Sequence, residues 1–92
     1  MHRYSSNQEF YDHIDQVVGA LHATGHSSLA GQIHFLLHKV SWTTSNELFD
    51  ELRDRFEKLL NSSTPLSSSI EADIRNFIIT IDQGLARANG SV

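Results

Sequence analysis

Two pairs of histidines are the residues of this 92-residue chain that are best suited to chemistry. His22 and His26 are four residues apart, and His34 and His38 have the same spacing. On one face of a helix, this spacing lets two imidazoles share a metal ion. Gly25 interrupts the first pair, because glycine commonly ends a helix. Only the second pair is therefore expected to share a regular helical face.

We expect the second pair to border the hydrophobic core and not to bind a metal. If the chain folds back on itself at Gly25, His34 and His38 come level with residues 14–18. They would then lie beside Asp15, whose carboxylate can accept a hydrogen bond, and far from His22. No metal or other cofactor is predicted, and a histidine-based metal-binding protein is kept as the third functional hypothesis.

Acidic side chains form the second candidate site. The segment 43–61 carries five of the eleven carboxylates of the chain, on the face opposite its apolar stripe. Together with two carboxylates nearer the N-terminus, they are the predicted contacts with a basic partner: Glu9, Asp12, Glu47, Asp50, Glu51, Asp54 and Glu57. The interleaved Arg53, Arg55 and Lys58 also fit a solvated helix face, with ion pairs worth about 0.2–0.5 kcal/mol each.

Two large apolar residues fall outside the apolar stripes. On a helical wheel, Phe35 and Ile79 point nearly opposite the stripes of their own segments. Phe35 is predicted to be an apolar anchor for a partner, and cover by a neighbouring helix is the alternative.

The composition limits the classes of function. Eleven acidic residues against seven basic ones give a formal charge of −4, which argues against direct nucleic-acid binding and favours a basic protein partner. The chain has no cysteine, and no apolar run approaches the roughly 20 residues of a membrane span. We expect a cytoplasmic protein without membrane contact, either a monomer or a weak homodimer. No phosphate loop or nucleophile motif is present, so an enzyme is not predicted.

Four amphipathic segments are predicted to be the helices that carry these residues. Apolar residues recur in them at the spacing of one helical face. The predicted helices span about residues 7–24, 28–40, 44–61 and 66–89. Because short connections favour antiparallel neighbours, the predicted fold is all-α, a compact up-down four-helix bundle in a single domain, residues 1–92. Two stacked helical hairpins are the alternative.

Local signals define the ends of the predicted helices. The expected N-terminal caps are Ser6 with Glu9, Ser27 or Ser28, Thr44 with Glu47, and a residue between Pro65 and Ser69. Gly25 and Gly90 are expected to end the first and fourth helices, and Trp42 to cover one end of the bundle. Gly84 lies inside the fourth helix, where glycine costs up to about 1 kcal/mol relative to alanine, and so predicts a close contact between helices.

The third segment and the last helix together resemble a known family. TTSNELFDELRDRFEKLL (residues 43–60) is followed by a polar linker and IEADIRNFIITIDQGL (residues 70–85). This arrangement is similar to small all-helical bacterial immunity proteins of polymorphic toxin and contact-dependent growth inhibition systems. There, a pattern close to T/S-x-x-E-L-hydrophobic-x-x-L-R opens one helix, and an isoleucine-rich helix ends in D-x-x-L. The matching residues are Thr44, Glu47, Leu48, Phe49, Leu52, Arg53, Ile78, Ile81, Asp82 and Leu85.

The resemblance covers about residues 10–88 and implies a small acidic antitoxin that binds and neutralises a cognate toxin, often a nuclease. It carries no shared site motif. The leading hypothesis is therefore an inhibitor that covers the active-site groove of a basic nuclease domain with an acidic helical surface. A helical adaptor or regulatory module that dimerises through Phe35 or Ile79 is the second hypothesis.

Overall fold

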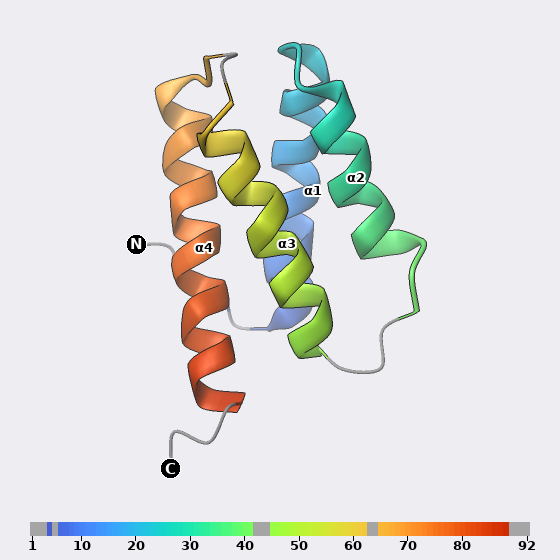
Figure 1. Cartoon of the computed structure of the whole chain (residues 1–92), viewed down its shortest axis with the longest axis vertical. Helices are drawn as coiled ribbons and strands as arrows, with labels where there is room; N and C mark the ends of the chain where they lie inside the picture. The colour runs from blue at the N-terminus through green and yellow to red at the C-terminus, as the bar shows by residue number, and fades with distance from the viewer. Residues whose placement is uncertain (1–3, 5, 42–44, 63–64, 89–92) are drawn as a thin grey trace.

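The computed structural model describes residues 4, 6–41, 45–62 and 65–88, and within them the chain forms four helices. They are α1 (Asn7–Ala23), α2 (Ser27–His38), α3 (Ser45–Leu60) and α4 (Ser68–Ala88). The helices alternate in direction, and each packs against its neighbours in the sequence (Figure 1). The predicted all-α, up-down four-helix bundle is confirmed. Contacts of α2 with α3 and of α1 with α4 join the two hairpins into one bundle.

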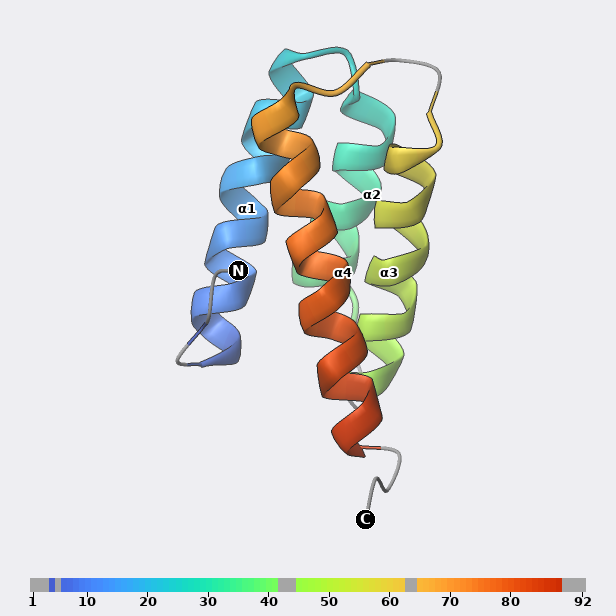
Figure 2. The ribbon, with the colours of Figure 1, turned by 90° about the vertical axis from the view of Figure 1, so that its left-hand side faces the viewer.

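The arrangement places α1 and α3 at opposite corners of the bundle. The turned view shows α1 and α3 on its two sides, with α4 in front and α2 behind (Figure 2). The outer surfaces of α1 and α3 therefore face away from each other, and those of α2 and α4 do the same. No helix among the described residues is both long and apolar enough to cross a membrane.

One hydrophobic core receives side chains from all four helices. The described aliphatic residues with no exposed surface are Ile14, Leu21, Ala30, Ile33, Leu52, Ile74 and Ile81. Aromatic rings fill the space between them. The ring of Phe77 lies 5.8 Å from that of Phe10 and 5.3 Å from that of Phe56, measured between centroids. The apolar stripes of the sequence thus face inward, because burying them together is the main favourable term in folding.

The ends of α1 are as predicted. The Ser6 hydroxyl accepts a hydrogen bond from the Glu9 amide at 3.2 Å. At the other end, Gly25 has a φ of 87°, a left-handed backbone conformation that residues with a Cβ atom rarely adopt. The His26 amide then donates to the Leu21 carbonyl at 3.1 Å, the bond that closes a Schellman turn.

The predicted caps of α2 are wrong. The cap is His26 and not Ser27 or Ser28, and it makes no side-chain capping bond. The Gly25 turn has already fixed the chain at this point, and the buried His26 ring lies 3.3 Å from the Pro65 carbonyl oxygen. At its other end, α2 stops at His38, two residues before the expected end.

The start of α4 lies within the predicted interval. Ser67 caps it, since its hydroxyl accepts from the Ile70 amide at 3.2 Å. The predictions for Trp42, Thr44 and Gly90 fall outside the described residues.

A close approach of α4 to α3 explains the glycine inside α4. A Cβ atom at Gly84 would lie 2.9 Å from Cε2 of the buried Phe49 ring, which is closer than carbon atoms pack. The predicted helix contact at Gly84 is confirmed.

Candidate functional site

The five predicted carboxylates of α3 lie on its outer surface. Glu47, Asp50, Asp54 and Glu57 are exposed, and Glu51 is half-buried. The apolar side of α3 faces α2 and α4, so the acidic side is left to the solvent.

Arg53 joins the outer surface of α3 to that of α4. Its guanidinium forms an ion pair with Glu57 on the same helix and another with Asp82 of α4, where Nε and Oδ1 are 2.6 Å apart. The hydrogen bond to Asp82 raises the pKa of Arg53 above its ordinary value. Asp82 was not among the predicted site residues, although it extends the acidic surface onto α4.

The remaining cations of α3 also pair with its carboxylates. Nη1 of Arg55 lies 2.6 Å from Asp54 and 3.3 Å from Glu51. Nζ of Lys58 lies 3.1 Å from Asp54, and this hydrogen bond lowers the pKa of the Asp54 carboxyl. The C-terminal half of α3 is therefore largely neutralised by its own side chains.

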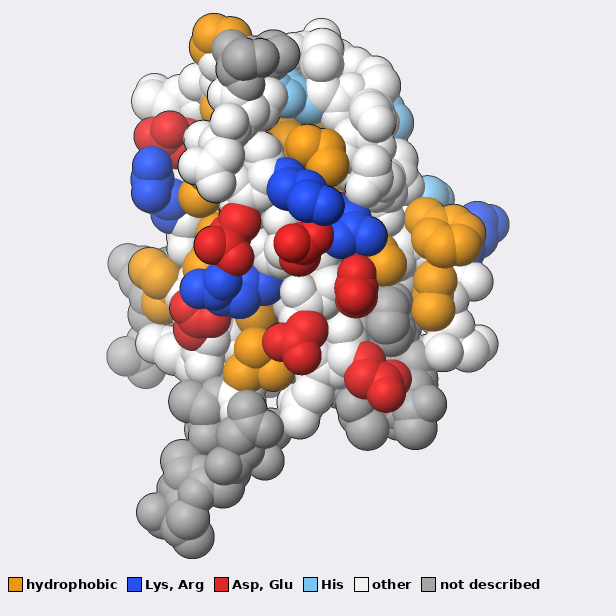
Figure 3. Space-filling model, viewed as in Figure 1, with side chains coloured by type: hydrophobic (Ala, Val, Ile, Leu, Met, Phe, Trp, Pro, Cys, Tyr) orange, Lys and Arg blue, Asp and Glu red, His pale blue; other side chains and the backbone are white. Residues whose placement is uncertain are grey.

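The N-terminal half of α3 carries three carboxylates and no Lys or Arg of its own. All three cations of α3 follow Asp50 in the sequence, and no described Lys or Arg side chain forms an ion pair with Asp50. Figure 3 shows blue side chains among the red ones over the upper part of this face, and red alone toward the lower end, where α3 begins. The excess charge of this surface is thus concentrated at the start of α3.

The two predicted carboxylates of α1 lie on another side of the bundle. Glu9 and Asp12 are exposed and line a shallow hollow with His13 and Gln16. Because α1 and α3 occupy opposite corners, these carboxylates do not form one patch with those of α3, as the sequence suggested they would.

The two outward apolar residues are exposed as expected. Phe35 exposes 54% of its surface on α2, and Ile79 exposes 45% on α4. Since α2 and α4 are also at opposite corners, Phe35 and Ile79 do not combine into one apolar patch.

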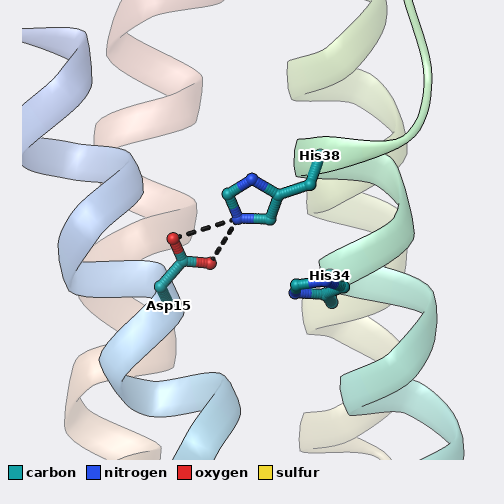
Figure 4. A group of neighbouring side chains, drawn as sticks. All are labelled: Asp15, His34 and His38. Carbon is teal, nitrogen blue, oxygen red and sulfur yellow. Dashed lines mark hydrogen bonds and ion pairs between the residues drawn. The ribbon is translucent and has the colours of Figure 1, made fainter.

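A hollow between α1 and α2 gathers the candidate metal ligands. Nε2 of His38 lies 2.9 and 3.1 Å from the two carboxylate oxygens of Asp15 (Figure 4). His34 lies one helical turn earlier on α2, with its ring centroid 4.7 Å from that of His38. The expected position of the pair beside Asp15 is confirmed. His22 lines the same hollow but lies outside the close group formed by Asp15, His34 and His38.

Two other histidines have structural roles. Nδ1 of His13 lies 2.8 Å from the Tyr4 hydroxyl, and its Nε2 lies 3.7 Å from Asp73 of α4. Burial raises the pKa of Tyr4, so this hydroxyl stays protonated and is a poor nucleophile. The contact of His13 with Asp73 holds α1 to α4. His26 holds the connection between α1 and α2 against Pro65.

Comparisons of the chain with models of protein families, with curated proteins and with solved structures found no match. A function is therefore inferred from the chemistry of these surfaces.

The sequence holds a signal that would have found Asp82. Gly84 marks the place where α4 meets α3 at Phe49. In an antiparallel pair, a residue before Gly84 comes level with one after Phe49, which brings Asp82 toward Arg53. To predict this contact from the sequence, only the register between α3 and α4 would have been needed in addition.

Proposed function

We propose that the protein is an immunity protein, a non-enzymatic antitoxin that binds and neutralises a basic toxin domain in the cytoplasm. One observation carries the proposal: α3 and Asp82 hold six carboxylates against three cations, with the cations confined to one half of the helix. The resemblance of residues 43–85 to immunity proteins agrees with it.

The start of α3 is the proposed point of contact. Asp50 is exposed and forms no ion pair with a described residue. A cation of the partner can therefore pair with Asp50 without displacing Arg53, Arg55 or Lys58. A negative surface of this kind steers a positively charged protein and raises its association rate, most strongly at low salt. A nuclease groove, which is positively charged to hold phosphates, is the partner surface that fits best.

Capture from the cells that make the protein tests the proposal. The immobilised chain is expected to retain a basic protein, and Asp50→Lys to weaken that association about tenfold, equivalent to ~1.4 kcal/mol. Asp12→Lys reverses one exposed charge on α1 and is the matched control, which should bind as the wild type does. Circular dichroism of each variant checks that it is folded.

Three results would count against the proposal. If no basic protein is retained, or if Asp50→Lys binds as tightly as Asp12→Lys, the α3 surface is not the contact. If the retained protein is harmless when expressed without the chain, binding stands but the immunity role does not.

Homodimerisation through Phe35 is the alternative that sedimentation separates from this proposal. An adaptor of that kind would sediment as a dimer and become a monomer on Phe35→Asp. The immunity proposal expects the unbound chain to sediment as a monomer with or without the substitution.

A further inference from the structure

The geometry points to a binding site for a divalent first-row transition metal, such as zinc, formed by Asp15 of α1 with His34 and His38 of α2. One possible ligand atom from each of the three side chains lies within 4.8 Å of those of the other two. Two imidazoles and a carboxylate are a ligand set that zinc and its neighbours in the first row accept. The inference does not rest on the proposed function, because it concerns another face of the bundle.

The hydrogen bond between Asp15 and His38 does not account for His34. A carboxylate that merely anchors one imidazole needs no second one beside it. Yet the His34 ring lies next to the pair and projects toward α1 (Figure 4), and it forms no hydrogen bond or ion pair with a described residue. A shared metal ion would be coordinated by all three side chains, including His34.

The distances require only small movements of side chains. Ligand atoms about 2.0–2.2 Å from a zinc ion stand roughly 3.3 Å apart in a tetrahedron. Nε2 of His38 and Oδ1 of Asp15 are already 2.9 Å apart, so the ligand atom of His34 must approach by at most about 1.5 Å. The backbone needs no change, because the ligands come from two packed helices and the two histidines are one turn apart.

The surroundings of the three ligands favour a metal site with one coordination position open to solvent. The exposed fractions of the His38 and Asp15 side chains are 42% and 36%, so an ion can enter from the solvent. Three protein ligands leave the fourth tetrahedral position to water. The hollow faces away from α3 and α4, which lie behind the three side chains in Figure 4. The metal site and the α3 surface can therefore be tested separately.

Titration of the untagged, chelator-treated protein with zinc chloride tests the inference. Calorimetry is expected to show one zinc ion per chain. His34→Ala, His38→Ala and Asp15→Asn should each weaken binding at least about tenfold, since each removes a direct ligand. Cobalt(II) should give the visible absorption of a tetrahedral site in the wild type and lose it in His34→Ala. Magnesium, which prefers oxygen ligands, should not compete.

His22→Ala is the matched control, because His22 lines the same hollow but lies outside the set of three. Its zinc affinity is expected to equal that of the wild type. Circular dichroism distinguishes loss of a ligand from loss of the fold in every variant. The inference is overturned if zinc does not bind saturably, if His34→Ala binds as the wild type does, or if His22→Ala weakens binding as much as His34→Ala.

Discussion

The two hairpins of the bundle, α1–α2 and α3–α4, differ in how the polar side chains along their outer seams are paired. On α3–α4, Arg53 binds carboxylates of both helices, so the seam is closed by permanent charges. On α1–α2, the seam holds imidazoles, and Asp15 pairs with only one of the two nearest it.

This difference follows from the chemistry of the side chains. A guanidinium is always charged and can bind two carboxylates at once, so it uses up the acceptors around it. A neutral imidazole keeps a nitrogen lone pair that can bind a metal. Two hairpins with the same packing can therefore differ in the ligands they can bind. The α1–α2 seam, which holds histidines, is the one with nitrogen atoms that can coordinate a metal ion.

The largest expected effect concerns the core, where the two hairpins should not differ. Leu21 of α1 and Leu52 of α3 are both fully buried. Leu21→Ala and Leu52→Ala should each lower the free energy of unfolding by about 2–5 kcal/mol, because each leaves a cavity. Urea denaturation measures both. A loss below about 1 kcal/mol in either variant would mean that its hairpin is not packed into the shared core.

A smaller effect on stability is expected from adding a methyl group at a glycine, and its sign should differ between α4 and α2. Gly84→Ala should be destabilising, since crowding the buried Phe49 ring costs about 1–3 kcal/mol, which outweighs a gain in helix propensity of up to about 1 kcal/mol. Gly31→Ala in α2 is the matched change, because the added Cβ has no atom within 4 Å apart from its chain neighbours and the backbone of its own helix. It should stabilise the protein by about 0.5–1 kcal/mol. Thermal melts of the two variants that shift in the same direction would contradict the close contact at Gly84.

The smallest effect concerns the paired surface of α3. The hydrogen bond from Lys58 lowers the pKa of Asp54 in the folded state below its ordinary value of 3.8. The pair therefore contributes its full stability above that value, and the contribution is lost as the pH falls through the folded-state pKa. Asp54→Asn should melt slightly below the wild type at pH 7, and the difference should vanish in strong acid and shrink in high salt.

Asp50→Asn is the control for this prediction, because it removes the same charge where no described cation forms an ion pair. It should not lower the melting temperature at pH 7. An equal loss in both variants would show that ion pairing on α3 is not the cause.

The helical content and topology could be predicted because the pattern is local. Apolar residues at helical spacing, Ser6 before α1 and Gly25 after it each act on the turn beside them. The cap of α2 could not be predicted in the same way. His26 occupies that position because the preceding turn fixes it and because its ring meets Pro65, which is 39 residues away.

Local patterns in the sequence predict the four helices, their buried faces and the outward position of Phe35 and Ile79, because each depends on residues within a few turns. Gly84 predicts that α4 approaches a neighbouring helix closely, but not that the neighbour is Phe49 of α3. Which surfaces are continuous depends on how the helices pack together. Their packing placed Glu9 and Asp12 apart from the α3 carboxylates, joined Asp82 to Arg53 and brought His22 to the hollow of His34 and His38. These relations depend on how one helix is positioned against another, which is set by the packing of the whole core and not by the pattern of any single segment.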